Sequence, residues 1–194
     1  MRIAAYLFAA LLIGLTAPRT YANSIVVPNF DATVVANDDS GSLAGSPPSL
    51  EVQDDYDSAQ FSSAGGPILI TGFAWRMKPG TGSITVTDTS GSMYLSTTQY
   101  AANTSSGHPL LTTNLATNRG PDNTLVYSAG PGTLWSSTGC GGPGPCPFDV
   151  VFTFSTPFLY NPSQGNLLVD LQATGLVGTG AGEFDVASYN ADPA

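Results

Sequence analysis

Acidic side chains are the residues of this chain that could do chemistry together. Two carboxyl groups facing each other across a cleft can hydrolyse a glycosidic bond, one as the acid and the other as base or nucleophile. The candidates are Glu51, Asp54, Asp55, Asp57, Asp149, Asp170, Glu183 and Asp185. The sequence places no two of them across a cleft, and we expect most to accept hydrogen bonds from backbone amides in turns. We therefore assign no catalytic residue.

Calcium is the one cofactor that the acidic segments allow, because this ion takes about six to eight oxygen ligands. The sequence contains neither an EF-hand loop nor a Gly-Gly-x-Gly-x-Asp repeat. The candidates for calcium ligands are Asp38, Asp39, Asp54, Asp55 and Asp57.

Exposed aromatic side chains could form a stacking platform for sugar rings. Trp135 follows the turn-rich Gly130–Gly132 and Tyr100 begins an irregular segment, so both are ligand-binding candidates. Trp75 alternates with apolar neighbours and is expected in the core. Either environment is open for Tyr94, Tyr127 and Tyr160.

The first 22 residues have the three parts of a secretory signal peptide. After a short basic start, the apolar run Ile3–Leu15 is followed by Thr20-Tyr21-Ala22, with small residues at the expected positions. We expect a helical signal peptide over 1–22, cleavage between Ala22 and Asn23, and one domain over 23–194. The apolar run is shorter than a membrane span requires.

The charge balance excludes two classes of partner. The chain has a formal net charge of −9 at pH 7, and beyond the signal peptide its only basic residues are Arg76, Lys78 and Arg119. Nucleic acids and anionic membrane surfaces attract clustered Lys and Arg, which are absent from this sequence. The acidity itself favours solubility outside the cell.

Cys140 and Cys146 enclose the sequence GGPGP. In an exported protein this pair predicts a local disulfide, because a Gly- and Pro-only spacer can close a tight loop. A zinc site is disfavoured, since zinc takes about four ligands and His108 is the only histidine. His108 lies in SSGHPL, which we expect to be an exposed loop, and no G-x-S-x-G elbow accompanies it.

Short alternating segments separated by turns predict an all-β fold, an antiparallel sandwich of jelly-roll-like form. Ile68–Met77 and Phe148–Phe154 alternate most clearly. We expect an opening strand in Asn23–Val35, a loop over Asn37–Ser49, and one or two helical turns within Tyr100–Gly120. Further strands are expected within Leu50–Phe61, Ser83–Asp88, Met93–Ser96, Thr124–Ser128, Thr133–Ser136, Asn166–Ala173 and Glu183–Tyr189.

Several segments also form an ordered set along the chain. They are VPNFDATVVAND (27–38), YDSAQF (56–61), ITGFAWR (70–76), YLSTT (94–98), TLVYSAG (124–130), FDVVFTFSTPFLYNPSQGNLLVDL (148–171) and EFDV (183–186). This set resembles the exported bacterial proteins that carry a C-terminal PEP-CTERM sorting signal. The resemblance implies a β-sandwich sorted to the cell surface or extracellular matrix of an exopolysaccharide-producing Gram-negative bacterium, with no established catalytic residues.

The sequence departs from that family at its end. After NADPA no PEP motif, apolar helix or basic tail follows. We therefore expect a truncated polypeptide whose domain is incomplete at its C-terminus. Its membrane contact would then come only through the export signal or a missing C-terminal anchor.

Together these observations predict a secreted, non-enzymatic protein of the envelope or matrix that adheres to or contacts glycans. The expected partners are extracellular polysaccharides or envelope components. Two alternatives stay open: a carbohydrate-active jelly-roll enzyme with a carboxylate pair, and a calcium-assisted, lectin-like sugar-binding domain.

Overall fold

The computed structural model describes residues 24–36, 38–41, 48–101, 108–180 and 182–186. The expected signal peptide and its cleavage site between Ala22 and Asn23 lie outside these ranges. Within them, no helix has both the length and the apolar character needed to cross a membrane.

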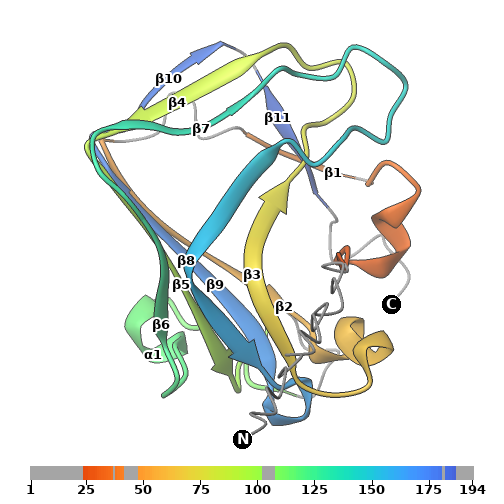
Figure 1. The fold of residues 1–194 in the computed structure, drawn as a ribbon, viewed down its shortest axis with the longest axis vertical. Helices are drawn as coiled ribbons and strands as arrows, with labels where there is room; N and C mark the ends of the chain where they lie inside the picture. Colours follow the sequence, from red (N-terminus) through yellow and green to blue (C-terminus); the bar gives the residue numbers. More distant parts are fainter. Residues whose placement is uncertain (1–23, 37, 42–47, 102–107, 181, 187–194) are drawn as a thin grey trace, which may run out of the picture.

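Antiparallel strands make up most of the described chain, and short helical turns join them (Figure 1). The strands are β1 (Asp38–Gly41), β2 (Ser49–Tyr56), β3 (Ile68–Trp75), β4 (Ile84–Asp88), β5 (Ser90–Thr98), β6 (Thr124–Ala129), β7 (Gly132–Ser137), β8 (Val150–Tyr160), β9 (Asn166–Thr174), β10 (Val177–Gly180) and β11 (Glu183–Val186). The helical turns are η1 (Asn29–Ala32), η2 (Ser58–Ala64), α1 (Leu115–Asn118) and η4 (Pro162–Gln164).

The strands pair in a nested order. β5 pairs with β6, and further out along the chain β4 pairs with β7, β3 with β8, β2 with β9 and β1 with β11, always antiparallel. This is the pairing of one long hairpin rolled into two layers, as in a jelly roll. The expected all-β, jelly-roll-like sandwich is therefore confirmed.

Two sheets face each other and enclose the core. The two-stranded sheet β3-β8 lies in front of the four-stranded sheet β2-β9-β5-β6 in Figure 1, and the sheet β10-β4-β7 lies above them. Side chains from both facing sheets pack between them, among them Phe152, Phe158, Met93, Val169 and Leu171. Alternation sends every second residue of each strand into this core and the others outwards.

The N-terminal segment does not form the opening strand that we expected from Asn23–Val35. Within its described part, Asn29–Ala32 form η1 after Pro28. The backbone N–H of Asn29 donates to Oε1 of Gln60 at 2.7 Å. Contacts with distant parts of the chain thus hold this segment in place of a strand ladder, and the prediction of a strand was wrong here.

Arg76 supplies the strongest of these contacts. Its side chain is 3% exposed, and its Nε donates to Asp185 Oδ2 at 2.6 Å. The same guanidinium donates to the backbone carbonyls of Asp31 at 2.7 Å and Val34 at 2.6 Å. The ring of Phe148 lies 5.2 Å from its Cζ. One buried cation therefore ties the N-terminal segment to the end of β3 and to β11.

Two short strands and one helix depart from the expected boundaries. β1 lies inside the segment Asn37–Ser49 that we expected to be a loop, and it pairs with β11. β10 was not expected and extends the sheet beside β4. The helical turns expected within Tyr100–Gly120 are present only as α1, so the apolar spacing before Leu115 is not helical in the described residues.

Candidate functional site

The outer face of the four-stranded sheet carries a band of polar side chains. The register places Gln53 of β2 opposite Asp170 of β9, and Asp170 opposite Tyr94 of β5. One position further on the same face, Glu51 lies opposite Gln172. The intervening residues of these strands point into the core, so the alternation alone puts the polar side chains on one surface.

Asp170 is the hub of this band. The residue is 1% exposed, yet its Oδ2 accepts hydrogen bonds from Gln53 Nε2 at 2.6 Å and Arg119 Nε at 2.8 Å. Its Oδ1 accepts a weaker bond from Gln172 Nε2 at 3.3 Å. A buried carboxylate is tolerated when a cation and further donors satisfy it, as they do here.

The segment that carries α1 is fastened onto the same face. Asn118 Nδ2 donates to Gln53 Oε1 at 2.9 Å, and Gln53 Nε2 also donates to the carbonyl of Leu115 at 3.0 Å. Thr98 Oγ1 of β5 donates to the carbonyl of Asn118 at 2.6 Å. These bonds position the residue that follows, Arg119, over the sheet.

Arg119 bridges two carboxylates. In addition to its bond with Asp170, its NH2 donates to Glu51 Oε1 at 2.5 Å. The hydrogen bond that Arg119 donates to Asp170 is the main cause that raises the pKa of Arg119, and the charges of Asp170 and Glu51 act in the same direction. The guanidinium is therefore fixed in position and permanently charged.

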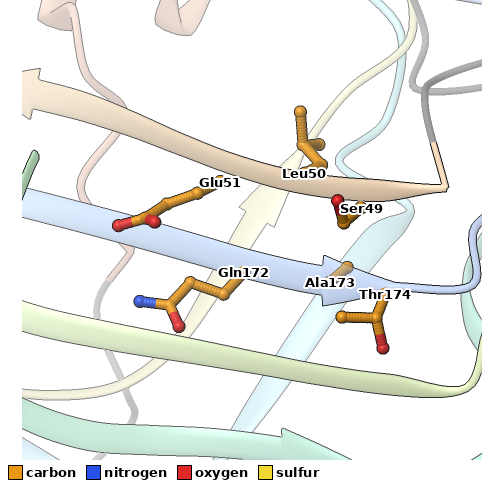
Figure 2. A pocket seen from close by; sticks show the side chains of 6 residues that line it. All are labelled: Ser49, Leu50, Glu51, Gln172, Ala173 and Thr174. Atoms are coloured by element: carbon orange, nitrogen blue, oxygen red, sulfur yellow. The ribbon is translucent and has the colours of Figure 1, made fainter. Parts of the chain in front are cut away.

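A shallow groove of about 270 Å³ lies beside this ion-pair network. Figure 2 shows the side chains of Glu51 and Gln172 pointing the same way from neighbouring strands. Its lining residues are Ser49, Leu50, Glu51, Gln172, Ala173 and Thr174. Hydrogen bonds within the described residues leave three polar atoms unused at this place: Glu51 Oε2, Gln172 Oε1 and Arg119 NH1. The groove thus offers two acceptors, from β2 and β9, and Arg119, which does not line the groove, adds one donor beside it.

The other acidic candidates are dispersed. Asp149 accepts hydrogen bonds from Ser137 and Thr138, and Asp57 caps η2 through the backbone N–H of Ala59. Asp185 is held by Arg76. The remaining candidate, Glu183, forms a long, exposed ion pair of 3.4 Å with Lys78. Of these four, only Asp57 bonds a neighbouring backbone amide as the turn argument predicts, whereas Asp149, Asp185 and Glu183 connect segments farther apart in the chain.

Asp54 is different because it lies on the core side of β2, opposite Val169. Burial raises its pKa to about 6, and its negative charge contributes to the raised pKa of Tyr56. Its neighbour Asp55 points to the outer face, where its Oδ2 accepts from Asn166 Nδ2 at 3.1 Å. Consecutive strand residues face opposite ways, so these two carboxylates cannot converge on one ion.

No group of three or more acidic, cysteine or histidine side chains within the described ranges is arranged to hold a metal ion. Asp38 and Asp39 lie in β1, but their side chains are outside the described set. Calcium binding at the acidic segments stays a prediction.

The aromatic candidates differ in their exposure to solvent. Trp135 is 4% exposed, and its ring packs 5.1 Å from that of Phe184 in the core. Its assignment as a stacking residue was wrong, because β7 turns this side chain inwards. Tyr100 is half-buried, and its carbonyl accepts from Asn166 Nδ2 at 3.2 Å. Tyr94, left undecided by the sequence, lies half-buried on the polar face next to Asp170.

The predicted disulfide is confirmed. Cys140 and Cys146 are bonded, with their Cα atoms 5.9 Å apart. The backbone of Cys140 also exchanges bonds with the turn after β3, donating to the carbonyl of Thr81 at 2.9 Å and accepting from Gly80 N at 2.7 Å. His108, expected in an exposed loop, is half-buried at the border of the described residues.

A second groove, of about 380 Å³, lies between η2 and η4. No charged residue lines it; the lining consists of Phe61, Ser62, Gly65, Gly66, Pro67, Asn161, Pro162 and Ser163. It offers fewer fixed charges and amides than the groove beside Arg119, which we regard as the better candidate.

Three residues of the candidate site were not singled out from the sequence: Gln53, Arg119 and Gln172. The sequence offered one signal for Arg119, the scarcity of basic residues. An arginine in a chain with many carboxylates is expected to form an ion pair with one of them. Comparisons with protein-family models, curated proteins and solved structures give no match to this chain.

Proposed function

We propose that the protein is an exported, non-enzymatic β-sandwich of the bacterial envelope or extracellular matrix that binds polysaccharide. The contact surface is the groove between Glu51 and Gln172 together with Arg119. One observation carries this proposal: a rigid, mixed set of donor and acceptor atoms lies at the surface and is anchored by the buried Asp170. Sugar hydroxyl groups both donate and accept, so they match such a set.

The charge of the site selects the class of polysaccharide. Glu51 lines the groove, and the whole chain carries a formal net charge of −9. Like charges repel across an interface, which disfavours acidic polymers. Neutral, hydroxyl-rich polysaccharide is the better ligand, with the half-buried ring of Tyr94 as its apolar neighbour on the same face.

Binding is favoured over hydrolysis by the position of Arg119. A glycosidase leaves the space between its two carboxyl groups for the sugar and, in inverting enzymes, for a water molecule. Here the guanidinium contacts both Glu51 and Asp170, at 2.5 and 2.8 Å, and takes that space. The carboxylates act as anchors for a donor and not as an acid and base.

Export and surface location rest on the signal-peptide pattern of residues 1–22 and on the resemblance to PEP-CTERM proteins. Both are consistent with an acidic, disulfide-containing domain that meets polysaccharide outside the cell.

The test is isothermal titration of the purified protein with a soluble neutral glucan, a neutral galactan and acidic alginate. We expect binding to at least one neutral polymer and weaker binding to alginate. Arg119→Gln and Gln172→Ala should each lower the affinity by about tenfold, because each removes one hydrogen-bonding group from the proposed contact surface. Lys78→Gln, which removes a basic residue from an exposed pair elsewhere, is the matched control and should bind like the wild type.

Two outcomes would overturn the proposal. Absence of binding to every polymer removes the glycan contact altogether. Release of reducing ends that Glu51→Gln abolishes would instead establish the enzymatic alternative. Titration in EDTA separates the lectin-like alternative, because binding that requires calcium would be lost there, whereas the groove described here needs no ion.

A further inference from the structure

A row of polar side chains crosses the outer face of the four-stranded sheet β2-β9-β5-β6. The register pairs Glu51 of β2 with Gln172 of β9, the two residues that point the same way in Figure 2. Gln172 also pairs with Ser92 of β5, and Ser92 pairs with Ser128 of β6. Directly paired residues of neighbouring strands project from the same face, so these four side chains lie in a line across the strands. We call them the transverse row, and the groove at Glu51 and Gln172 is its first half.

Every position of the transverse row is open to solvent and carries an unused hydrogen-bonding group. Glu51 and Ser128 are exposed, and Gln172 and Ser92 are half-buried. The hydroxyl groups of both serines make no hydrogen bond within the described residues. A hydroxyl group can both donate and accept, as the hydroxyl groups of a sugar do. Only Glu51 is charged, so most of the row suits a neutral ligand.

An apolar pair flanks the transverse row on the same face. The pairing of β5 with β6 shifts register between Met93 and Tyr94, and beyond this bulge Tyr94 lies opposite Leu125. A bulge re-aims the neighbouring side chains, and here it turns Leu125 outwards, where it is 43% exposed. Sugar rings have apolar faces and polar edges. The side chains of Tyr94 and Leu125 therefore offer the apolar contact, and the row offers the polar one.

The open direction on this face is across the strands. Towards the start of β9, the outward residue next to Gln172 is Asp170, which is 1% exposed and bonded to Arg119. A polymer that followed the strand would meet this ion pair, whereas across the strands the row continues to Ser128. Neighbouring strands are about 4.8 Å apart, a step close to the length that one sugar adds to an extended chain. A straight chain can therefore place one sugar on each strand.

We propose that the transverse row binds a single extended, neutral polysaccharide chain that crosses the sheet, with about one sugar on each of its strands. This inference rests on the proposed function, because the groove at Glu51 and Gln172 is the first half of the row. It narrows the ligand to polymers whose chain is straight. A chain that coils does not present successive sugars to successive strands.

Titration of the purified protein with size-fractionated oligosaccharides tests the length of this track. The probes are fragments of the neutral glucan and galactan that test the proposed function. We expect the affinity to rise with each sugar up to about four and to level off beyond, because the sheet then offers no further strand. A mixed-linkage β-glucan, whose chain is extended, should bind more tightly than amylose, whose chain coils, although both consist of glucose.

Ser92→Ala and Ser128→Ala separate the row from the groove. Each removes one hydroxyl group and should lower the affinity for fragments of about four sugars or more about threefold, and the double variant about tenfold. The affinity for the disaccharide, which the groove alone can hold, should stay as in the wild type. Ser136→Ala is the matched control, because it removes an exposed hydroxyl group from β7, outside the four-stranded sheet, and should not change binding.

Failure of this inference is distinguishable from failure of the proposed function. If no neutral polymer binds, the polysaccharide contact itself is wrong, and the transverse row falls with it. If a neutral polymer binds but the affinity stops rising at the disaccharide, the groove is the whole site and the row is wrong. The row is also overturned if the double variant binds long fragments like the wild type, if Ser136→Ala loses as much affinity as Ser128→Ala, or if amylose binds more tightly than the β-glucan.

Discussion

Arg76 and Asp185 form a buried ion pair in which Nε and Oδ2 are 2.6 Å apart and neither side chain is more than 3% exposed. The pair joins the end of β3 to β11, and Asp185 Oδ1 also accepts from the backbone N–H of Ala36 at 3.0 Å. The carboxylate of Asp185 thus accepts hydrogen bonds both from the N-terminal segment, at Ala36, and from the residue that follows β3, Arg76. Arg76 also donates to two backbone carbonyls, so replacing either member of the pair leaves buried polar groups without a partner.

Arg76→Ala should therefore destabilise the protein by about 3–5 kcal/mol, because it leaves Asp185 buried without a cation. Arg76→Lys should also destabilise it, since an ammonium group lacks the planar fork that reaches several acceptors at once. Chemical denaturation followed by tryptophan fluorescence measures both effects. Lys78→Ala removes the exposed pair with Glu183 and should change stability by no more than about 1 kcal/mol. Equal losses in the two alanine variants would contradict this interpretation of the pair.

The disulfide between Cys140 and Cys146 closes a short loop, with a sequence separation of 6. Replacing both cysteines with serine should lower the free energy of unfolding by about 2 kcal/mol, the chain-entropy value for a loop of this size. The same loss should appear when the wild type is measured under reducing conditions. A midpoint of denaturation that reduction leaves unchanged would show that the loop is held by its bonds to Gly80 and Thr81 alone.

Asp54 should make stability depend on pH. Burial raises its pKa from 3.8 to about 6, so the folded state binds the proton more tightly than the unfolded chain does. This contribution to stability is complete below about pH 4 and is lost as the pH rises through about 6. Asp88 adds to the trend, because burial raises its pKa as well and its carboxylate oxygens have no hydrogen-bond partner within the described residues.

Asp54→Asn should accordingly be more stable than the wild type by about 1–2 kcal/mol at pH 7, where the wild-type carboxylate is charged. Near pH 4 the two proteins should be equally stable. Urea denaturation at several pH values gives this difference directly. Parallel pH profiles for Asp54→Asn and the wild type would refute the assignment.

Gly120 should be required for the position of Arg119. A Cβ atom at residue 120 would lie 1.8 Å from the carbonyl oxygen of Thr97. Gly120→Ala must therefore push the segment away from the sheet, at a cost of about 1–3 kcal/mol. Polysaccharide binding should fall with it, because Arg119 leaves Asp170. Gly130→Ala, where the added Cβ has no neighbour within 4 Å, is the control and should be tolerated in both assays.

The parts of the fold that the sequence predicted are those with a local signal. Alternation between apolar and polar residues identified β3, β4 and β8, because one face of each strand packs into the core. The segment DDSG of β1 has no such signal, and its residues have low strand propensity. It is a strand because its partner β11 lies beside it, from a position almost at the other end of the described chain.

Distant partners also explain why the strand predicted in the N-terminal segment is absent. The apolar residues Ile25 and Val34 suggested a strand, but the conformation between them is set by Gln60 and Arg76. Neither of these partners can be inferred from local pattern. Trp135 illustrates the converse: a turn beside it suggested exposure, and the direction of its side chain was decided by the register of β7 against β4.

The candidate site was the least predictable part. Its carboxylates, Glu51 and Asp170, were among the candidates, yet their proximity arises from the pairing of β2 with β9 and from a bridge that a third segment supplies. A list of acidic residues contains no information about which of them share an arginine. The sheet register is the missing quantity, and it is fixed by the whole fold.

The hydrogen bonds that Arg76 donates to Asp31, Val34 and Asp185 affect how the domain would respond to force. Pulling on the two ends of the described domain would load β1 and β11 from the same side, since Asp38 lies opposite Val186. An antiparallel strand pair loaded in this way loses its hydrogen bonds one at a time from the loaded end. The pair β1-β11 would open first, and the pair β2-β9 would be loaded next. The guanidinium of Arg76 grips the chain on both sides of that first ladder, at Asp31 and Val34 and at Asp185. Tension applied to the two ends of the described domain would therefore load the side chain of Arg76 before it loaded the sandwich.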